Sequence, residues 1–220
     1  MFLSMYNDLI IIRRADKADM ELIARTHTFC FNHGFTSSLH KLNYACFGGD
    51  LTAAFYLEYF IDFPELFIVA ESNGTIVGFC MGYYLDKTDQ LSRFIKHNVT
   101  RLLLKVPVLI LTGDKPTWKK VYQVITRAQE KVDVIDPLPE CISPNEISDI
   151  LSICVLPEYR GLNIASKLVN EFIKTSRARQ CKVCLLTVED DNIRAINFYK
   201  KMGFKAYSNK INKKGYKKLL

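Results

Sequence analysis

Apolar and polar positions divide the first part of the chain into short strands and amphipathic segments. The apolar run over residues 9–13 predicts a strand. After it, Asp16 opens a helix, and Asp19 stands three residues later as a variant of the capping box. Two further apolar runs in ELFIVAESNGTIVGFCMGYYL are joined by Asn73-Gly74, a dipeptide that tolerates positive φ at both positions. We expect a strand, a helix and then a β-hairpin.

The pattern changes between residues 86 and 143. The stretch LSRFIKHNVTRLLLKVPVLIL has apolar residues at helical spacing, contains no acid and breaks at Pro107. A second helical pattern begins at Pro116, in KPTWKKVYQVITRAQEK. We interpret 86–143 as a helical insertion within a single domain that spans 1–220. Its role stays open between an interfacial helix on an anionic membrane, a lid over a substrate site, a homodimer contact and an additional helix packed on the core.

The last third of the chain alternates strands and helices. A strand is expected in ISDILSICV, a helix from Gly161 to Arg177, a strand in CKVCLLTV, a helix from Asn192 to Met202 and a final strand or hairpin in FKAYSNKINKKGYKKLL. This alternation predicts an α/β fold with a parallel pair of strands inside an otherwise mixed sheet.

Charge is distributed unevenly along the 220 residues. The net charge of +7 lies in the last twenty residues, which contain seven lysines and no acid. A lysine-rich end can attract phosphate or an acidic surface. Nucleic-acid modules usually interleave basic residues with a recognisable docking element, so we interpret this end as a solvated strand and tail and predict no nucleic-acid binding.

Targeting and metal signals are weak. The start, MFLSMYNDLIIIRR, lacks the basic region of a signal peptide, and no apolar run approaches the ~20 residues of a membrane span. Seven cysteines in apolar segments fit a reducing compartment, so a cytoplasmic protein is expected. The single CxxC lies in a strand-like run, and the four histidines lack ligand spacing. No metal site is predicted.

The stretch VLPEYRGLNIASKL is a candidate anion-binding junction. An apolar run ends at Pro157, and helical spacing begins with no acid after the loop. A helix start presents unpaired N–H groups and a partial positive charge, which stabilise an anion such as phosphate. Arg160 adds a fixed charge, Gly161 allows close backbone approach, and Asn163 tolerates left-handed geometry. By itself this pattern is also compatible with an ordinary structural turn.

A second motif makes the first more specific. In NIRAINFYKKMGF, Asn192, Ala195 and Tyr199 share one helix face. Together, VLPEYRGLNIA and NIRAINFYKKMGF resemble the paired signatures of the GNAT acetyltransferase superfamily, V-x-P-x-x-R-G-x-G-[IV]-[AG] and N-x-x-A-x-x-x-Y-x-x-x-G-F. The chain departs from the pattern at Asn163, where the family more often has glycine. The resemblance covers both ends of the chain but not 86–143, and it implies a mixed central sheet flanked by helices.

The resemblance also implies binding of acetyl-CoA. The fourth and fifth strands are expected to splay apart, and the pantetheine arm to run along the fourth like an added strand. The backbone of Ile153, Cys154 and Val155 then holds pantetheine and the acetyl carbonyl, while Asn192 and Tyr199 line the thioester end. The pyrophosphate is expected on Arg160, Gly161, Leu162, Asn163, Ile164, Ala165 and Ser166.

Attack of an amine on a thioester requires several groups. A base must take the proton of an amine whose pKa is ordinarily ~10.4. A backbone N–H, which we place at Val155, stabilises the carbonyl oxygen, and an acid protonates the departing thiolate. Tyr199 is the expected acid, although a tyrosine at this spacing could also be a packing residue.

The base is less well marked. The candidates are Glu146, Asp149 and Glu189, of which we favour Asp149 because it shares strand parity with Val155. Cys154 has no histidine near it in the sequence to activate it, so direct transfer without a covalent cysteine is expected.

Three functions remain. The first is N-acetylation of a primary amine on a small molecule or amino sugar. The second is protein acetylation at an N-terminus or lysine, and the third is an acyl-CoA-binding module without turnover. Tyr199 and the Arg160-Gly161 pair favour an enzyme. The acceptor itself cannot be assigned because the segments that would contact it carry no shared motif.

Overall fold

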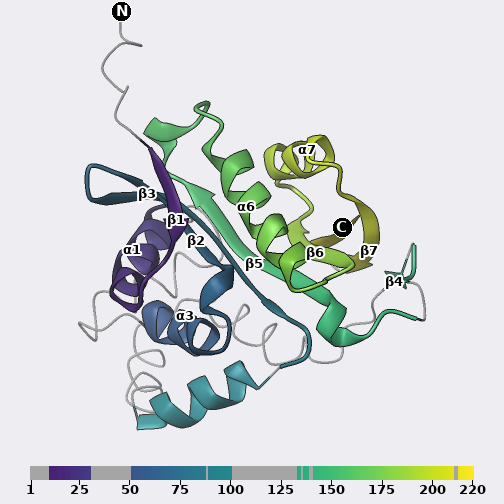
Figure 1. Cartoon of the computed structure of the whole chain (residues 1–220), viewed down its shortest axis with the longest axis horizontal. Coiled ribbons are helices and arrows are strands. Elements are labelled where there is room, and N and C mark those ends of the chain that lie inside the picture. The colour runs from purple at the N-terminus through teal and green to yellow at the C-terminus, as the bar shows by residue number, and fades with distance from the viewer. Residues whose placement is uncertain are drawn as a thin grey trace, which may run out of the picture.

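One mixed β-sheet runs through the protein and has helices on both faces (Figure 1). The computed structural model describes residues 10–30, 51–87, 89–100, 133–134, 136–138, 141–210 and 213–220. Across these residues the strands follow the order β1 (Ile11–Arg14), β2 (Phe67–Ser72), β3 (Thr75–Tyr84), β5 (Ile147–Val155), β6 (Val183–Glu189), β8 (Lys213–Leu219), β7 (Lys205–Lys210) and β4 (Asp133–Val134). Neighbouring strands are antiparallel except β5 and β6. The predicted parallel pair inside a mixed sheet is confirmed.

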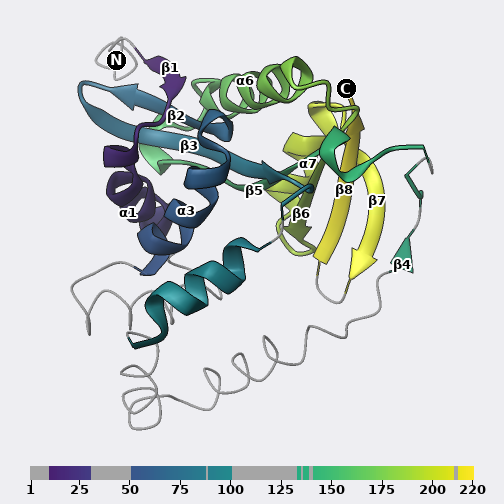
Figure 2. The same ribbon diagram turned by 60° about the horizontal axis from the view of Figure 1, so that its bottom comes forward.

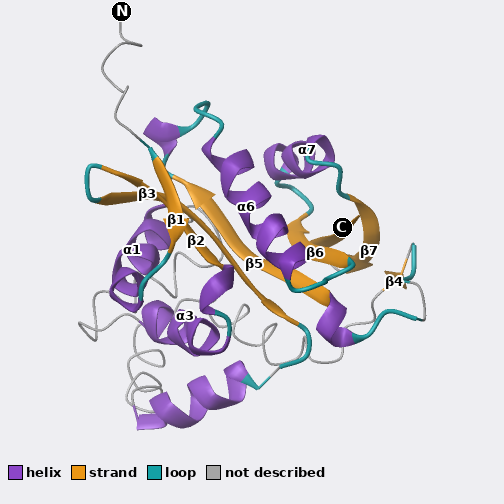
Figure 3. Cartoon of the chain, viewed as in Figure 1, coloured by secondary structure: helices purple, strands orange, loops and turns teal. Residues whose placement is uncertain are grey.

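Two pairs of helices enclose the sheet (Figures 2 and 3). On one face, α1 (Met20–Cys30) and α3 (Leu51–Asp62) bury Phe67, Val69, Phe79 and other apolar side chains of β2 and β3. On the other face, α6 (Ile164–Ala178) and α7 (Ile193–Lys201) close a larger core with Cys80, Ile150, Val155, Cys184 and Leu186. Alternate residues of β3 and β5 therefore belong to different cores, as the two-residue period of a strand requires.

The N-terminal turn and the hairpin form as predicted. The backbone N–H of Asp16 donates to the carboxylate of Asp19 at 2.7 Å, which completes the capping box. Asn73 and Gly74 have φ of 49° and 76° and join Ser72 directly to Thr75. The backbone of β2 therefore returns as β3 through a two-residue turn that fits the twist of the strands.

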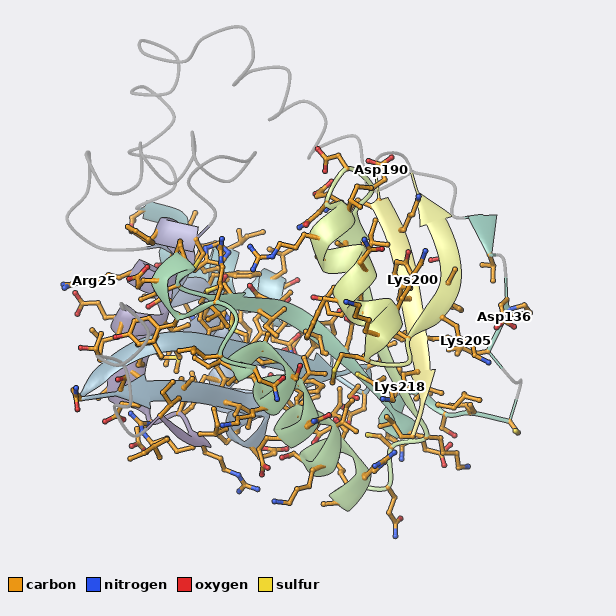
Figure 4. All side chains as sticks on the ribbon, turned by 90° about the horizontal axis from the view of Figure 1, so that it is seen from above. Arg25, Asp136, Asp190, Lys200, Lys205 and Lys218 are labelled. Atoms are coloured by element: carbon orange, nitrogen blue, oxygen red, sulfur yellow. The ribbon has the colours of Figure 1, made fainter. Side chains whose placement is uncertain are left out.

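The lysine-rich end is less solvated than expected, because β8 lies between β6 and β7. Lys217 is buried and donates to the carbonyls of Asp136 and Pro137 at 2.9 and 3.1 Å. Lys218 donates to the carbonyl of Met202 at the end of α7. Figure 4 shows it on the same side of the molecule as the exposed Lys200 and Lys205. Two of the terminal lysines thus tie other segments to the sheet.

The first predicted helix of the insertion is present over residues 90–100, and it is held to α3 by charged side chains. Arg93 Nε lies 3.2 Å from a carboxylate oxygen of Glu58, and Arg93 Nη2 also binds Asp62. His97 Nδ1 lies 2.7 Å from Glu58, and Gln90 donates to Asp62 at 2.9 Å. Both acids are largely buried, so their charges depend on these partners.

The remainder of the insertion is described only in part. The helix predicted after Pro116 lies outside the described residues. Residues 133–134, inside the predicted insertion, form the edge strand β4 against β7. The boundaries 86–143 of the insertion stay a prediction. The insertion is not purely helical, because it contains the strand β4.

Arg93→Ala should lower the free energy of unfolding by about 2–3 kcal/mol, because it leaves two buried carboxylates without their guanidinium. Arg93 itself is partly exposed, so the solvent screens part of its interaction with the two acids. Urea denaturation followed by circular dichroism measures the change. Lys96→Ala is the matched control, since Lys96 is exposed on the same helix. Equal losses for the two variants would contradict the anchoring role of Arg93.

Candidate active site

The parallel pairing of β5 and β6 stops halfway along the strands. It runs from Ile147 opposite Val183 to Ile150 opposite Leu186. Beyond that point β5 stays paired with β3 up to Val155, and β6 stays paired with β8 up to Glu189. Each strand is thus held by its outer neighbour while the two inner edges separate. We call residues 151–155 the unpaired edge of β5.

The polar groups of this edge can be assigned from two hydrogen bonds. The N–H of Leu156 donates to the carbonyl of Val77 at 2.9 Å, so it points toward β3. The carbonyl of Val155 instead accepts from Nε of Arg160 at 3.1 Å. Because successive residues of an antiparallel strand point their backbone groups to opposite edges, Val155 and Ile153 direct their amides toward β6. An extended ligand could pair with them as an added strand.

The unpaired edge leads into a turn with left-handed residues. After a 3-10 turn at Pro157–Tyr159, Gly161 has φ of 88°, and Asn163 has φ of 60° and ψ of 17°. The space around Gly161 is open, so glycine is required there by its backbone angle and not by crowding. Asn163 is a non-glycine residue that adopts the left-handed conformation without strong strain.

The turn ends at the N-terminus of α6, which begins at Ile164, three residues later than the predicted start at Gly161. Asn163 is the N-cap but makes no side-chain capping bond, and the first turn contains no acid. The N–H of Lys167 donates to the carbonyl of Asn163 at 3.2 Å. The preceding N–H groups of Ile164, Ala165 and Ser166 therefore stand at the open end of a fifteen-residue helix, four residues after Arg160. Such a helix end can stabilise an anion.

Tyr199 lies on the α6–α7 face of the sheet. Its ring contacts those of Phe198 and Phe204 at centroid distances of 5.3 and 5.8 Å. Burial raises the pKa of Tyr199 well above its usual range, and the nearby thiols of Cys80 and Cys184 raise it further. The phenol is consequently protonated at neutral pH and can donate a proton.

Asn192 has a structural contact in addition to its predicted place near the thioester. It is the N-cap of α7, and its side-chain oxygen accepts from the N–H of Ala195 at 3.1 Å. Asn192 and Ala195, the two specified residues of the motif N-x-x-A, thus cap the N-terminus of the helix that carries Tyr199.

Asp149 does not share the face of Val155, contrary to the sequence prediction. A register shift between β3 and β5 places Gly82 opposite Ile150 but Met81 opposite Ser152, so one extra residue is accommodated in β5. The bulge reverses the alternation. Val155 belongs to the core under α6, whereas Asp149 lies toward α3, where Tyr83 donates to it at 3.5 Å.

Crowding at the bulge explains Gly82. A Cβ at this position would lie 2.0 Å from the carbonyl oxygen of Asp149 and 2.8 Å from the ring of Phe172. Both contacts are closer than any real side chain permits, so the irregular pairing requires glycine here.

The other acids considered as the base are engaged in ion pairs. Glu146 lies 2.6 Å from Lys182 and also accepts from the N–H of Ser143 at 3.0 Å. The hydrogen bond from Lys182 is the main reason that the pKa of Glu146 is lowered. Glu189 pairs with Lys213 at 3.2 Å. Of the three candidates, only Asp149 lies next to the point where β5 and β6 separate.

Cys154 contributes only its backbone to the unpaired edge. Its side chain is buried on the opposite face, where Sγ lies 3.9 Å from the carbonyl oxygen of Thr26 and packs near Cys30. Burial raises the pKa of the Cys154 thiol, so it is a weak nucleophile. Direct transfer remains the expected route.

Sequence reasoning missed two tyrosines beside Asp149. Tyr83 lies on β3 and Tyr59 on α3, and their ring centroids are 5.4 Å apart. The helix that carries Tyr59 was not predicted, although LTAAFYLEYFID lacks glycine and proline and could have indicated it. No sequence signal joins the two tyrosines to Asp149, because their contact depends on the packing of α3 on the sheet.

Comparison with known proteins supports the motif assignment. Residues 134–204 match the model of the Acetyltransferase (GNAT) family. An uncharacterized N-acetyltransferase of Methanocaldococcus jannaschii is 36% identical over 63 residues, which are 29% of this chain and 28% of that protein. Both matches are confined to a part of the chain.

Solved structures extend the likeness to the fold. Ard1 from Thermoplasma volcanium has a TM-score of 0.55 and 18% identity, with 96% of this chain and 97% of that chain covered. The PaiA N-acetyltransferase from Thermoplasma acidophilum, solved in complex with coenzyme A, has a TM-score of 0.59 and 15% identity over 96% of this chain and 99% of that chain. At these identities the likeness concerns the fold.

The separated strands, the turn and the α6 N-terminus all lie in or beside residues 134–204, the part of the chain that matches the GNAT acetyltransferase family. This match agrees with the resemblance that the paired motifs indicated, and the solved structures show that the fold is shared. Two further findings bear on the other predictions. No described helix is long and apolar enough to cross a membrane. The described residues also contain no group of three or more His, Cys, Asp or Glu side chains that could hold a metal ion.

Asn163→Val should lower the free energy of unfolding by about 1–2 kcal/mol, because a β-branched residue is strained at this positive φ. Asn163→Gly is the control. It should keep wild-type stability or raise it slightly, since the side chain makes no capping bond and glycine adopts the conformation freely. Chemical denaturation without ligand measures both changes. A valine variant as stable as the wild type would contradict the strain.

Proposed function

We propose that the protein is an acetyl-CoA-dependent N-acetyltransferase that transfers acetyl directly to a primary amine of a small molecule or amino sugar. The unpaired edge of β5, which leads straight into the positive N-terminus of α6, is the observation that carries the proposal. A ligand with an extended amide-containing arm and a pyrophosphate matches both parts of this arrangement. Acetyl-CoA is such a ligand, and it supplies the activated acetyl group.

The chain's own groups divide the task of holding the cofactor. Ile153 and Val155 offer amides to the pantetheine arm. The turn and the N–H groups of Ile164, Ala165 and Ser166 at the N-terminus of α6 would hold the pyrophosphate, and the charge of Arg160 would help to neutralise it. Asn192 and Tyr199 approach from α7. The turn also includes Gly161 and Leu162, both of which are exposed residues.

The donor to the acetyl carbonyl is better assigned to Ile153 than to Val155. Six residues separate Asp149 from Val155, and extended strand rises ~3.3 Å per residue, so the two lie up to about 20 Å apart. The amide of Ile153 has the same orientation and is two residues closer. Val155 is next to Arg160 and the turn, where it suits the pantetheine–pyrophosphate junction.

Acid and base then act from opposite faces of the sheet. Tyr199, protonated and buried under α7, gives a proton to the departing thiolate. Asp149, on the face of α1 and α3, removes the proton of the amine as the carbon–nitrogen bond forms. The amine therefore enters from the α1–α3 face, and the two proton transfers do not compete for one group.

Two other functions use the same site. A protein N-terminus or lysine would present the same amine, and a module without turnover would bind acyl-CoA alone. CoA release measured with glucosamine, with a lysine-containing peptide and without any acceptor separates the three functions.

The first helix of the insertion adds a candidate contact surface, since Leu91, Ile95 and Val99 are exposed at intervals of four residues. A second copy or an anionic membrane surface would bind there.

Coenzyme A should raise the melting temperature of the wild-type protein. A ligand that binds only the native state raises the apparent free energy of unfolding by ~2.7 kcal/mol when its concentration is a hundred times its dissociation constant. Arg160→Glu should abolish the rise, because it places a negative charge beside the pyrophosphate. Differential scanning fluorimetry measures both, with Lys174→Glu on the far part of α6 as the control. A wild-type melting temperature unmoved by saturating CoA rules out the cofactor assignment.

Tyr199→Phe keeps the buried ring and removes only the hydroxyl. Turnover should fall by ~10²- to 10⁴-fold with CoA affinity near that of the wild type, because only proton donation is lost. CoA release under single-turnover conditions measures the chemical step. Unchanged turnover would leave Tyr199 as a packing residue.

A further inference from the structure

The carboxylate of Asp149 lies among protonatable side chains from three other elements. Tyr83 on β3 donates to its Oδ2 at 3.5 Å. Tyr59 on α3 and Cys184 on β6 are close enough for the charge of Asp149 to raise their pKa values, although burial is the larger cause for both. Burial and then Asp149 also raise the pKa of Tyr83. All three groups are therefore neutral at neutral pH, and the two tyrosines are able to donate.

Tyr83 is held in place by a series of edge-to-face aromatic contacts. Its ring meets that of Tyr59 at 5.4 Å, and Tyr59 meets Phe55 at 5.1 Å. Phe55 in turn meets Phe94, on the helix of residues 90–100, at 5.4 Å. These contacts pack the ring of Tyr83 against α3 on the face of the sheet where Asp149 lies.

The neighbouring Tyr84 shows that this arrangement is specific to Tyr83. Tyr84 points to the other face of the sheet, where it packs against Phe63 and Arg179. Its hydroxyl is buried, and the described part of the chain offers it no hydrogen-bond partner. Tyr83 is half-buried and Tyr84 is buried, and of these two adjacent tyrosines Tyr83 is the one that contacts Asp149.

We propose that Tyr83 is a positioning residue, which fixes the carboxylate of Asp149 and keeps it ionised so that it can accept the proton of the acceptor amine. This inference rests on the proposed acetyltransferase function. A hydrogen bond to a carboxylate stabilises the charged form. Without this bond, the carboxylate of Asp149 loses a donor that favours its ionised form and its present orientation.

The titration of Asp149 provides a readout that does not require the acceptor. Aspartate labelled with ¹³C at the side-chain carboxyl is followed by NMR across pH, and the resonance of Asp149 is assigned by its loss in Asp149→Asn. Tyr83→Phe should raise the pKa of Asp149, because the ionised carboxylate loses a hydrogen-bond donor. Tyr84→Phe, the matched control, should leave it unchanged. Equal values in wild type and Tyr83→Phe overturn the proposal.

The pH profile of CoA release with glucosamine or the lysine-containing peptide gives the functional readout. Only the ionised form of Asp149 is active as a base. The acidic limb of the pH profile of kcat/KM should therefore move to higher pH in Tyr83→Phe, by the same amount as the pKa of Asp149 moves in the titration. It should stay in place in Tyr84→Phe. If Tyr83→Phe raises the pKa of Asp149 but leaves the acidic limb of the kcat/KM profile in place, the positioning role is overturned, because Asp149 would then not be the base.

Failure of the proposed function is distinguishable from failure of this inference. If CoA does not raise the melting temperature of the wild type, the acetyltransferase assignment falls, and the inference falls with it. If CoA does so equally in the wild type, Tyr83→Phe and Tyr84→Phe, the fold and cofactor site are intact in all three. Changes confined to Tyr83→Phe then support the positioning role.

Discussion

The loss of pairing between β5 and β6 is the constraint on which the rest of the site depends. A strand edge inside a sheet normally has every N–H and C=O bonded to its neighbour. Here the last paired residues are Ile150 and Leu186, and β5 continues for five residues with one edge unpaired. The outer neighbours β3 and β8 keep the strands in place. The opening is thus part of the sheet architecture.

The bulge in β5 gives the two faces of this opening different chemistry. Without the extra residue, Asp149 and Val155 would lie on one side. With it, Asp149 faces α3 and the tyrosines, while Val155 and Tyr199 belong to the core under α6 and α7. The proposed base, Asp149, and the proposed acid, Tyr199, therefore lie on opposite faces of the sheet. Gly82 permits the irregularity because any side chain there would collide with the carbonyl of Asp149.

The α1–α3 side connects the site to the insertion. Arg93 fixes the helix of residues 90–100 to the buried carboxylates of α3, and Phe94 of the same helix contacts Phe55. From there the aromatic contacts continue to Tyr83 and Asp149. The segment with no family motif therefore reaches the proposed base through packed side chains.

The sequence alone determined the features that depend on neighbouring residues. The Asn73-Gly74 turn, the Asp16–Asp19 capping box and the left-handed Asn163 follow from local backbone preferences, and the paired motifs located the candidate site. Only the tertiary structure decided the face of Asp149, the partners of Glu146 and Glu189, and the contacts of Tyr59 and Tyr83. Strand parity predicts a face correctly only while the pairing is regular. A one-residue bulge is set by the crowding of β3, β5 and Phe172, which lie far apart in the sequence and meet only when the chain folds.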